Sequence, residues 1–285
     1  TWNHKIRKIV ISTGAVTTIA GTGSSGSTDH NTGTSASFHH PSGITTDGTN
    51  LYVADESTHT IRKIVISTGA VTTLAGTGSS GSTDHNTGTS ASFNNPAEIT
   101  TDGTNLYVAD RGNHKIRKIV ISTGAVTTFA GTGSAGSTDH NTGTSASFNN
   151  PHGITTDGTI LYVADESNHR IRKIVIDNGT VTTLAGQSDN GSADGIGTAA
   201  SFWNPYQITT DGTNLYVVDG FNHSIRKIVI STGVVTTIAG TPGSTGNADN
   251  PTGTSASFRG PRAITTDGKN LYVADGTNHR IRKIE

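Results

Sequence analysis

Aspartate residues recur at a spacing of 55 along this 285-residue chain, and repeated carboxylates of this kind could bind a divalent cation. The members of the series are Asp29, Asp84, Asp139, Asp194 and Asp249. The first three each begin the segment Asp-His-Asn-Thr-Gly-Thr, which matches the start of a calcium-binding loop. A complete EF-hand loop needs a closing glutamate, and His40 stands at that position after Asp29. We therefore expect the aspartates to cap turns in a glycine-rich loop, with bound Ca²⁺ as the alternative and no other cofactor.

Histidine could also ligate a metal ion or transfer protons, and the chain contains 12 histidines. Half of them recur once per repeat, at His4, His59, His114, His169, His223 and His279. A residue that returns in every copy does not mark a single catalytic centre. We interpret these six histidines as structural residues that form hydrogen bonds within turns.

Basic residues are concentrated in six copies of Ile-Arg-Lys, which hold 12 of the 20 lysines and arginines. Adjacent residues of a β-strand face opposite ways, so Arg62 and Lys63 cannot share one surface. The formal net charge is −1, which provides no general attraction for nucleic acid. We interpret these side chains as solvated residues of an outer strand that discourage edge pairing, and we expect no nucleic-acid partner.

One repeat accounts for nearly the whole chain. Its most recognisable segment, Asn-His-x-Ile-Arg-Lys-Ile or a close variant, begins at residues 3, 58, 113, 168, 222 and 278. The chain has 36 glycines and only 14% charged residues, a composition that indicates many turns. The absence of cysteine excludes disulfides and thiolate metal sites. No apolar run approaches the ~18 residues of a membrane helix, so we expect no membrane insertion.

Each repeat predicts four short β-strands. In one copy they cover residues 44–46, 51–54, 60–66 and 71–74. Asp47 and Gly48 favour a tight hairpin between the first two strands, and β-branched residues enrich the third. The second strand has apolar side chains on both faces, so the sheet must be covered on both sides. A small antiparallel sheet packed radially between copies of itself is a blade of a β-propeller.

The strand count predicts one all-β domain over residues 1–285, a five-blade β-propeller. The chain has five copies of the first, second and fourth strands and six of the third. We expect the fourth strand at 16–19 to pair with the third strand at 281–284 and to join the two ends as a strand clasp. The surplus third strand at 6–11 then competes for this place, pairs elsewhere or belongs to a sixth blade, so six blades is the alternative.

The segments Leu-Tyr-Val-Ala-Asp and Asn-His-x-Ile-Arg-Lys-Ile resemble those of the NHL-repeat β-propellers, especially the secreted bacterial ones. The spacing between the two segments recurs from Asp110 to Asn113, Asp165 to Asn168, Asp219 to Asn222 and Asp275 to Asn278. One repeat departs from it with Thr58 in place of asparagine. The resemblance covers essentially the whole chain. It implies a propeller fold and a binding, scaffolding or occasionally enzymatic role.

The repeats differ from one another mainly in two loops, the one before the first strand and the turn after the second. In an up-and-down sheet both lie at the same end, so we expect them to share one face around the mouth of the central channel. The candidate ligand-binding residues on this face are Trp203, Tyr206, Gln207, Phe221, Arg259, Arg262, His152 and Glu98. Neutral variation of loops is the competing explanation.

Exposed aromatic residues beside arginine suit a protein or glycan partner. We therefore expect a non-enzymatic binding or scaffold propeller that acts outside the cell or at its surface. One alternative is a structural protein that self-assembles through its surplus N-terminal strand. Another is a lyase or hydrolase that uses His39, His152, Glu98 and Arg262. No nucleophile, base and orienting group stand at an interpretable spacing, which disfavours catalysis.

Overall fold

The structure is a computed structural model that describes residues 2–285. Its regular elements are β-strands and single turns of 3-10 helix, with no α-helix in the part of the chain described. No helix in residues 2–285 has the length and apolar character needed to cross a membrane. The all-β prediction is confirmed, and so is the count of five propeller blades, since five sheets begin with a first strand.

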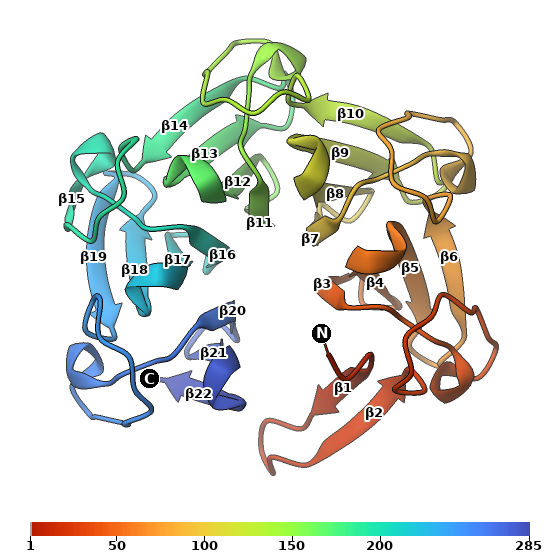
Figure 1. The fold of residues 1–285 in the computed structure, drawn as a ribbon, viewed down its shortest axis with the longest axis horizontal. Coiled ribbons are helices and arrows are strands. Elements are labelled where there is room, and N and C mark those ends of the chain that lie inside the picture. Colours follow the sequence, from red (N-terminus) through yellow and green to blue (C-terminus); the bar gives the residue numbers. More distant parts are fainter. Residues whose placement is uncertain (1) are drawn as a thin grey trace. The chain divides into compact units, whose positions relative to one another are not determined.

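The chain divides into two compact units, residues 1–129 and residues 130–285. In the first unit, the first sheet has the order β3 (Pro41–Thr46), β4 (Asn50–Asp55), β5 (Thr60–Val65) and β6 (Val71–Ala75). The second sheet has the order β7 (Pro96–Thr101), β8 (Asn105–Asp110), β9 (Lys115–Val120) and β10 (Val126–Ala130), whose last residue crosses the unit boundary. β1 (Ile6–Ile9) and β2 (Val16–Ala20) form a separate hairpin (Figure 1).

The second unit contains the other three sheets. One has the order β11 (Pro151–Thr156), β12 (Ile160–Asp165), β13 (Arg170–Val175) and β14 (Val181–Ala185). The next has β16 (Pro205–Thr210), β17 (Asn214–Asp219), β18 (Ser224–Val229) and β19 (Val234–Ala239), with β15 (Gly195–Ile196) on the outer edge of β19. The last sheet has three strands, β20 (Pro261–Thr266), β21 (Leu271–Asp275) and β22 (Arg280–Ile284).

Short 3-10 turns lie at two places in each repeat. One set precedes the first strand: η1 (Gly33–Ser35), η3 (Gly88–Ser90), η5 (Gly143–Ser145), η7 (Gly197–Ala199) and η9 (Gly253–Ser255). The other set joins the second and third strands: η2 (Glu56–Thr58), η4 (Arg111–Asn113), η6 (Glu166–Asn168), η8 (Gly220–Asn222) and η10 (Gly276–Asn278). The predicted strands agree with the observed ones to within a few residues at their ends.

The hairpin β1–β2 corrects the predicted strand clasp. The sequence assigns 16–19 to 281–284 as its partner, whereas in the structure β2 pairs with β1, with Ile9 opposite Val16. This register, including its irregularity, is the one that β5 and β6 adopt. A hairpin closed by a short turn orders much less chain than a pairing between distant segments, so the local partner is favoured entropically. The surplus third strand thus has a place within its own hairpin.

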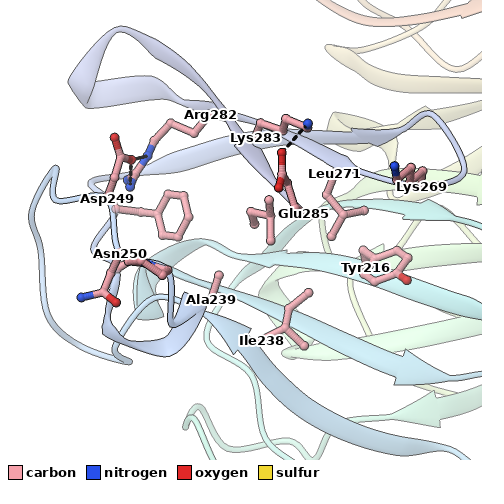
Figure 2. A pocket seen from close by; sticks show the side chains of 15 residues that line it. Tyr216, Ile238, Ala239, Asp249, Asn250, Lys269, Leu271, Arg282, Lys283 and Glu285 are labelled. Atoms are coloured by element: carbon pink, nitrogen blue, oxygen red, sulfur yellow. Dashed lines mark hydrogen bonds and ion pairs between the residues drawn. The ribbon is translucent and has the colours of Figure 1, made fainter.

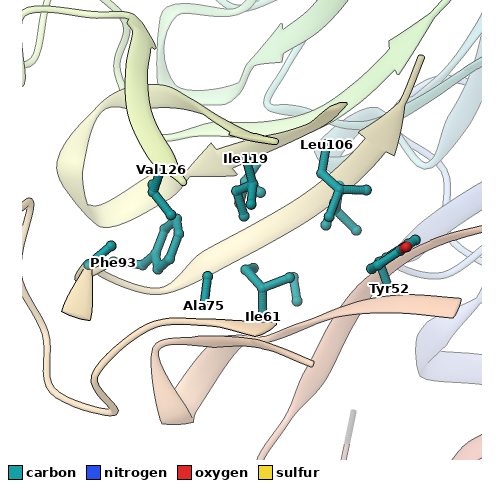
Figure 3. Packing of buried hydrophobic residues seen from close by; sticks show 11 residues of the cluster. Tyr52, Ile61, Ala75, Phe93, Leu106, Ile119 and Val126 are labelled. Atoms are coloured by element: carbon teal, nitrogen blue, oxygen red, sulfur yellow. The ribbon is translucent and has the colours of Figure 1, made fainter. Parts of the chain in front are cut away.

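Apolar residues on both faces of the sheets form the core between neighbouring blades. In the first unit, Tyr52 and Ile61 of one sheet pack with Leu106 and Ile119 of the next, and all four are fully buried (Figure 3). Phe93, from the loop before β7, lies in the same cluster. Burial on both faces explains why the second strands are nearly continuous apolar runs. The recurring tyrosines and phenylalanines, represented here by Tyr52 and Phe93, are packing residues in this cluster.

In five of the six Ile-Arg-Lys segments the arginine is buried, and there the interpretation of it as a solvated residue is wrong; Arg7 in the β1–β2 hairpin is exposed. Arg62 in β5 has no exposed surface. Its Nη1 donates to Asp55 Oδ2 at 3.2 Å and to the carbonyl of Ser37 at 2.9 Å. Its Nη2 donates to Asp29 Oδ1 at 2.6 Å. The guanidinium carbon lies 4.9 Å from the centre of the Phe38 ring. Strand alternation turns this side chain inward, where two carboxylates and an aromatic face hold it.

The same arrangement recurs in the other four sheets. The arginines are Arg117, Arg172, Arg226 and Arg282, and their buried partners are Asp110, Asp165, Asp219 and Asp275. A buried charge is tolerated only when its partners are in place, because the transfer from water costs several kcal/mol per ion. Each repeat is therefore fastened internally by a charged cluster.

Replacement of Arg117 by methionine is expected to lower the free energy of unfolding by about 3–5 kcal/mol, because it leaves the buried carboxylate of Asp110 unpaired. A urea titration followed by circular dichroism measures the change. Lys118→Met is the matched control, since the neighbouring side chain faces the other way and is half-buried. A control loss as large as that of Arg117→Met would contradict the role assigned to the arginine.

Candidate functional site

A buried aspartate at the end of each second strand brings the two variable loops together. Asp219 Oδ1 accepts a hydrogen bond from the backbone N–H of Trp203 at 2.8 Å, and its Oδ2 accepts one from Arg226 at 2.8 Å. The N–H of Phe221 donates to the carbonyl of Trp203 at 3.1 Å. Burial raises the pKa of Asp219 to about 6, because desolvation outweighs the donors that favour its charged form.

The equivalent bonds run from His39 to Asp55, Asn94 to Asp110, Asn149 to Asp165 and Arg259 to Asp275. In each of these sheets, as around Asp219, the loop before the first strand meets the turn after the second. The prediction that the two loops share one end of each sheet is confirmed.

The six repeated histidines occupy the left-handed backbone region just before the third strand. Four of them, His4, His59, His169 and His223, accept a hydrogen bond from the loop before the first strand of the next sheet. His59 has φ +56°, and its Nδ1 accepts a hydrogen bond from the N–H of Asn95 at 3.1 Å. His169 bonds Asn204 in the same way at 3.2 Å. The structural interpretation of the histidines is therefore correct for these residues, but the partner is a neighbouring blade rather than their own turn. Burial lowers the pKa of His59.

Two large aromatic side chains are exposed side by side on the variable end of the β16–β19 sheet. Trp203 is 40% exposed and Phe221 is 55% exposed, and their ring centres lie 5.7 Å apart. The other loops before first strands place histidine, asparagine or arginine at the position of Trp203. An exposed pair of large aromatic side chains is a candidate contact surface.

A second aromatic contact lies between neighbouring sheets of the second unit and includes a residue of β16. The ring centres of Tyr206 and His152 are 3.7 Å apart, and the guanidinium of Arg262 lies 5.9 Å from the Tyr206 ring. His152 is buried, whereas Arg262 is exposed. Arg259 is exposed as well, and its charge contributes, after burial, to the lowered pKa of His223 in the adjacent turn. We call Trp203, Tyr206, Phe221, Arg259 and Arg262 the rim patch.

The remaining predicted site residues contact backbone. Gln207 accepts a hydrogen bond through Oε1 from the N–H of Ile264 in the next sheet. Glu98, in the first unit, accepts one from the N–H of Ile44 at 3.3 Å. Both are therefore residues that join neighbouring blades. Of the residues that the catalytic alternative names, His39 and Glu98 belong to the first unit, and His152 and Arg262 belong to the second.

A group of rings in the first unit was not predicted as a cluster. His4 stacks on His40 with ring centres 5.3 Å apart, and His39 lies 5.0 Å from His40. The exposed ring of Trp2 lies 4.3 Å from His40. Burial and repulsion between the imidazoles lower the pKa values of His4 and His40. The available signal was His39-His40 in place of the Asn-Asn of two other repeats.

The five spaced aspartates form ion pairs with the buried arginines. The pairs join Asp29 to Arg62, Asp84 to Arg117, Asp139 to Arg172, Asp194 to Arg226 and Asp249 to Arg282, at 2.5–2.9 Å. The expectation that these aspartates cap turns of their own loop is therefore wrong. A carboxylate oxygen bonded to a guanidinium is already engaged, so the fixed spacing is explained without a cation. Residues 2–285 contain no group of three or more histidine, cysteine, aspartate or glutamate side chains arranged to hold a metal ion.

Comparison with known proteins agrees with the repeat and its geometry. The family model described as "NHL repeat" matches residues 148–174. The human "NHL repeat-containing protein 2" is 30% identical over 287 residues, which cover 88% of this chain. This chain is an NHL-repeat protein. It spans 39% of the length of the human relative.

Solved structures share the NHL-repeat chain's fold at lower identity. A nidogen/laminin complex contains a chain with a TM-score of 0.67 and 17% identity, covering 100% of this chain and 87% of that one. An auxiliary nutrient binding protein from Bacteroides ovatus has a TM-score of 0.57 and 21% identity, covering 91% of this chain and 72% of that one. At these identities the likeness shows the fold alone.

Acid is expected to destabilise the NHL-repeat chain through histidines such as His59. The lowered pKa of His59 means that the folded state binds fewer protons than the unfolded state. The contribution of His59 to the free energy of unfolding is therefore present above the ordinary pKa of 6.5 and is lost as the pH falls toward the lowered value. His59→Asn keeps an acceptor and suits the left-handed backbone, but it does not titrate. Its unfolding free energy should therefore fall less steeply between pH 7 and 5, by at most about 1.4 kcal/mol per pH unit.

Urea titrations at several pH values measure both slopes, and comparison with the unchanged protein cancels the other titrating groups. Equal slopes in the two proteins would show that protonation of His59 does not oppose folding.

Proposed function

We propose that this NHL-repeat protein is a non-enzymatic binding and scaffold propeller that recognises a protein or glycan through the rim patch. The observation that carries the proposal is the exposed pair of Trp203 and Phe221, which come from two different loops and lie 5.7 Å apart. Tryptophan, tyrosine and arginine are the residues most enriched at binding hot spots, and the patch contains all three. This composition favours a protein partner over a glycan.

The rigidity of the backbone beneath the patch supports the same function. Trp203 is held through its N–H by Asp219, and Arg259 is held in the same way by Asp275. A surface whose backbone is fixed before binding loses less conformational entropy when a partner arrives. The loop residues vary between repeats while these bonds do not. The sheets thus provide a constant frame on which two neighbouring blades present a distinct surface.

We also propose that the protein acts outside the cell or at its surface. The low charged fraction of 14%, the absence of cysteine and the Gly, Ser and Thr loops are compatible with export. The resemblance to secreted NHL-repeat proteins points the same way. Cell fractionation of the source organism, with an antibody to this chain, tests the location.

Simultaneous replacement of Trp203 and Tyr206 by alanine is expected to weaken partner binding by at least about 100-fold, since each hot-spot side chain contributes about 2 kcal/mol or more. Glycan arrays and pull-down from the culture medium identify the partner and its class, and surface plasmon resonance with the purified partner measures affinity. Phe221→Ala should weaken binding as well, because it removes one half of the exposed pair.

Trp2→Ala is the matched control, because Trp2 is an exposed tryptophan of the other unit, 77% exposed. It should leave the affinity unchanged. If the double variant binds as well as the unchanged protein while circular dichroism shows both folded, the rim patch is not the binding site.

A further inference from the structure

Two arginines of the rim patch lack the carboxylate partners that the buried arginines of the same unit have. Arg226, for example, pairs with Asp194 and Asp219, at 2.9 and 2.8 Å. Arg259 and Arg262 are exposed, and among residues 2–285 neither forms an ion pair. The rim patch therefore presents two positive charges that the described chain leaves without an acidic partner.

Both arginines are positioned by their surroundings. The backbone N–H of Arg259 donates to Asp275 Oδ1 at 2.8 Å. The guanidinium carbon of Arg262 lies 5.9 Å from the centre of the Tyr206 ring. Gly276 leaves room for the stem of this arginine, since a Cβ on Gly276 would lie 3.2 Å from Cγ and Cδ of Arg262. The stem of Arg262 therefore packs against the turn while its charge stays near an aromatic face.

The first residue of the turn between the second and third strands differs among the sheets in its charge. In chain order it is Glu56, Arg111, Glu166, Gly220 and Gly276. Glu166 Oε1 accepts a hydrogen bond from Nδ2 of Asn204, in the loop of the next sheet, at 3.5 Å. Gly260, which follows Arg259, is the equivalent of Asn204. A glutamate at position 220 would therefore face the loop of Arg259, and glycine leaves that arginine without an acidic neighbour.

Tyr206 connects these charges to the exposed aromatic pair. Gly220 precedes Phe221, and a Cβ on Gly220 would lie 3.6 Å from Cβ of Tyr206. The aspartates that end the two second strands, Asp219 and Asp275, are fully buried and paired with arginine. The exposed part of the patch thus combines apolar rings with unpaired positive charge. Protein interfaces bring such charges opposite a negative partner.

We propose that the rim patch recognises an acidic segment of a partner protein, in which an aspartate or glutamate stands beside a large apolar residue. The proposal rests on the function proposed above. The partner's carboxylate binds the guanidinium of Arg262 through paired hydrogen bonds, and Arg259 adds a second positive charge. The apolar side chain covers the ring pair of Trp203 and Phe221. Two arginines are too few for a nucleic acid, whose affinity comes from many phosphate contacts.

A random peptide library displayed on phage and selected against the full chain supplies the probe. We expect the enriched peptides to share an acidic residue next to leucine, phenylalanine or tryptophan. Fluorescence anisotropy measures the affinity of the most enriched peptide after labelling. The same peptide with each acid replaced by its amide is the matched control ligand. It should bind at least about tenfold more weakly, because hydrogen bonds to a charged group are the stronger ones.

Arg262→Gln should weaken binding of the acidic peptide by about tenfold and should change binding of the amide peptide little. Arg262→Lys keeps the charge without the planar fork, so it should restore only part of the affinity. Lys269→Gln is the matched control. Lys269 is exposed and lies in the turn between β20 and β21, at the end of the sheet opposite Arg262, where it lines a pocket (Figure 2). This variant should bind both peptides like the unchanged protein.

Gly220→Glu and Gly220→Gln form a second matched pair, because they add side chains of the same size that differ in charge. A Cβ at this position lies 3.1 Å from the carbonyl oxygen of Asn204, so both variants require the same small shift. Only the glutamate places a competing carboxylate beside Arg259. We expect the glutamate variant to bind the acidic peptide about fivefold more weakly than the glutamine variant. Circular dichroism checks that both are folded.

Equal binding of the acidic and amide peptides, or a selection that enriches no peptide, would overturn the proposal. If the enriched peptides are neutral and lose binding in Trp203→Ala but not in Arg262→Gln, the acidic specificity is wrong and the rim patch remains the binding site. If the peptides bind the Trp203 and Tyr206 double variant unchanged, the function proposed above fails too. Displacement of the peptide by poly-uridine RNA, with RNA binding lost in Arg262→Gln, would indicate a nucleic acid and overturn a protein partner.

Discussion

A buried arginine in the third strand of each of the five blades is the interaction on which the rest of the structure depends. One guanidinium joins two carboxylates and a loop carbonyl, so three segments of a repeat are tied to a single point, as around Arg62. Because an unpaired charge in the interior is very costly, none of these partners is optional. The carboxylate at the end of the second strand also fixes the backbone of the loop before the first, as Asp219 fixes Trp203. The side chains of these loops can therefore vary between repeats while the backbone position of each loop stays fixed.

This constraint separates the parts of the molecule that maintain the fold from those that are free to bind. Recurring charged and polar residues stabilise the fold. The spaced aspartates form ion pairs with arginine, and histidines such as His59 form hydrogen bonds with the backbone of the next sheet. Exposed residues outside these interactions differ from them in chemistry and in position. The rim patch is an aromatic and cationic surface on the loops and first-strand ends of two neighbouring sheets.

Much of this arrangement could be predicted from the sequence, because the repeats reveal their own strands and turns. The meeting of the Trp203 and Phe221 loops followed from the up-and-down order alone. The burial of Arg62 did not, because the usual preference of charged residues for solvent was applied to a strand covered on both faces. The available signal was Asp55, seven residues earlier and repeated with its arginine in other copies. The pairing of β2 with β1 depends on the competition between near and distant partners of identical sequence, which a pattern of residue types does not rank.

The near-identity of the third strands has a consequence for how the chain reaches its native state. Any Ile-Arg-Lys strand offers almost the same ladder to any Val-Thr-Thr strand, so the side chains supply little information about which pairing is the right one. The order of folding must then select the correct strand pairing. A hairpin such as β5–β6 forms before remote segments meet, because few residues separate its strands. Chains that emerge slowly and in order are protected by this advantage. Refolding at high concentration removes it and favours misassembly between molecules.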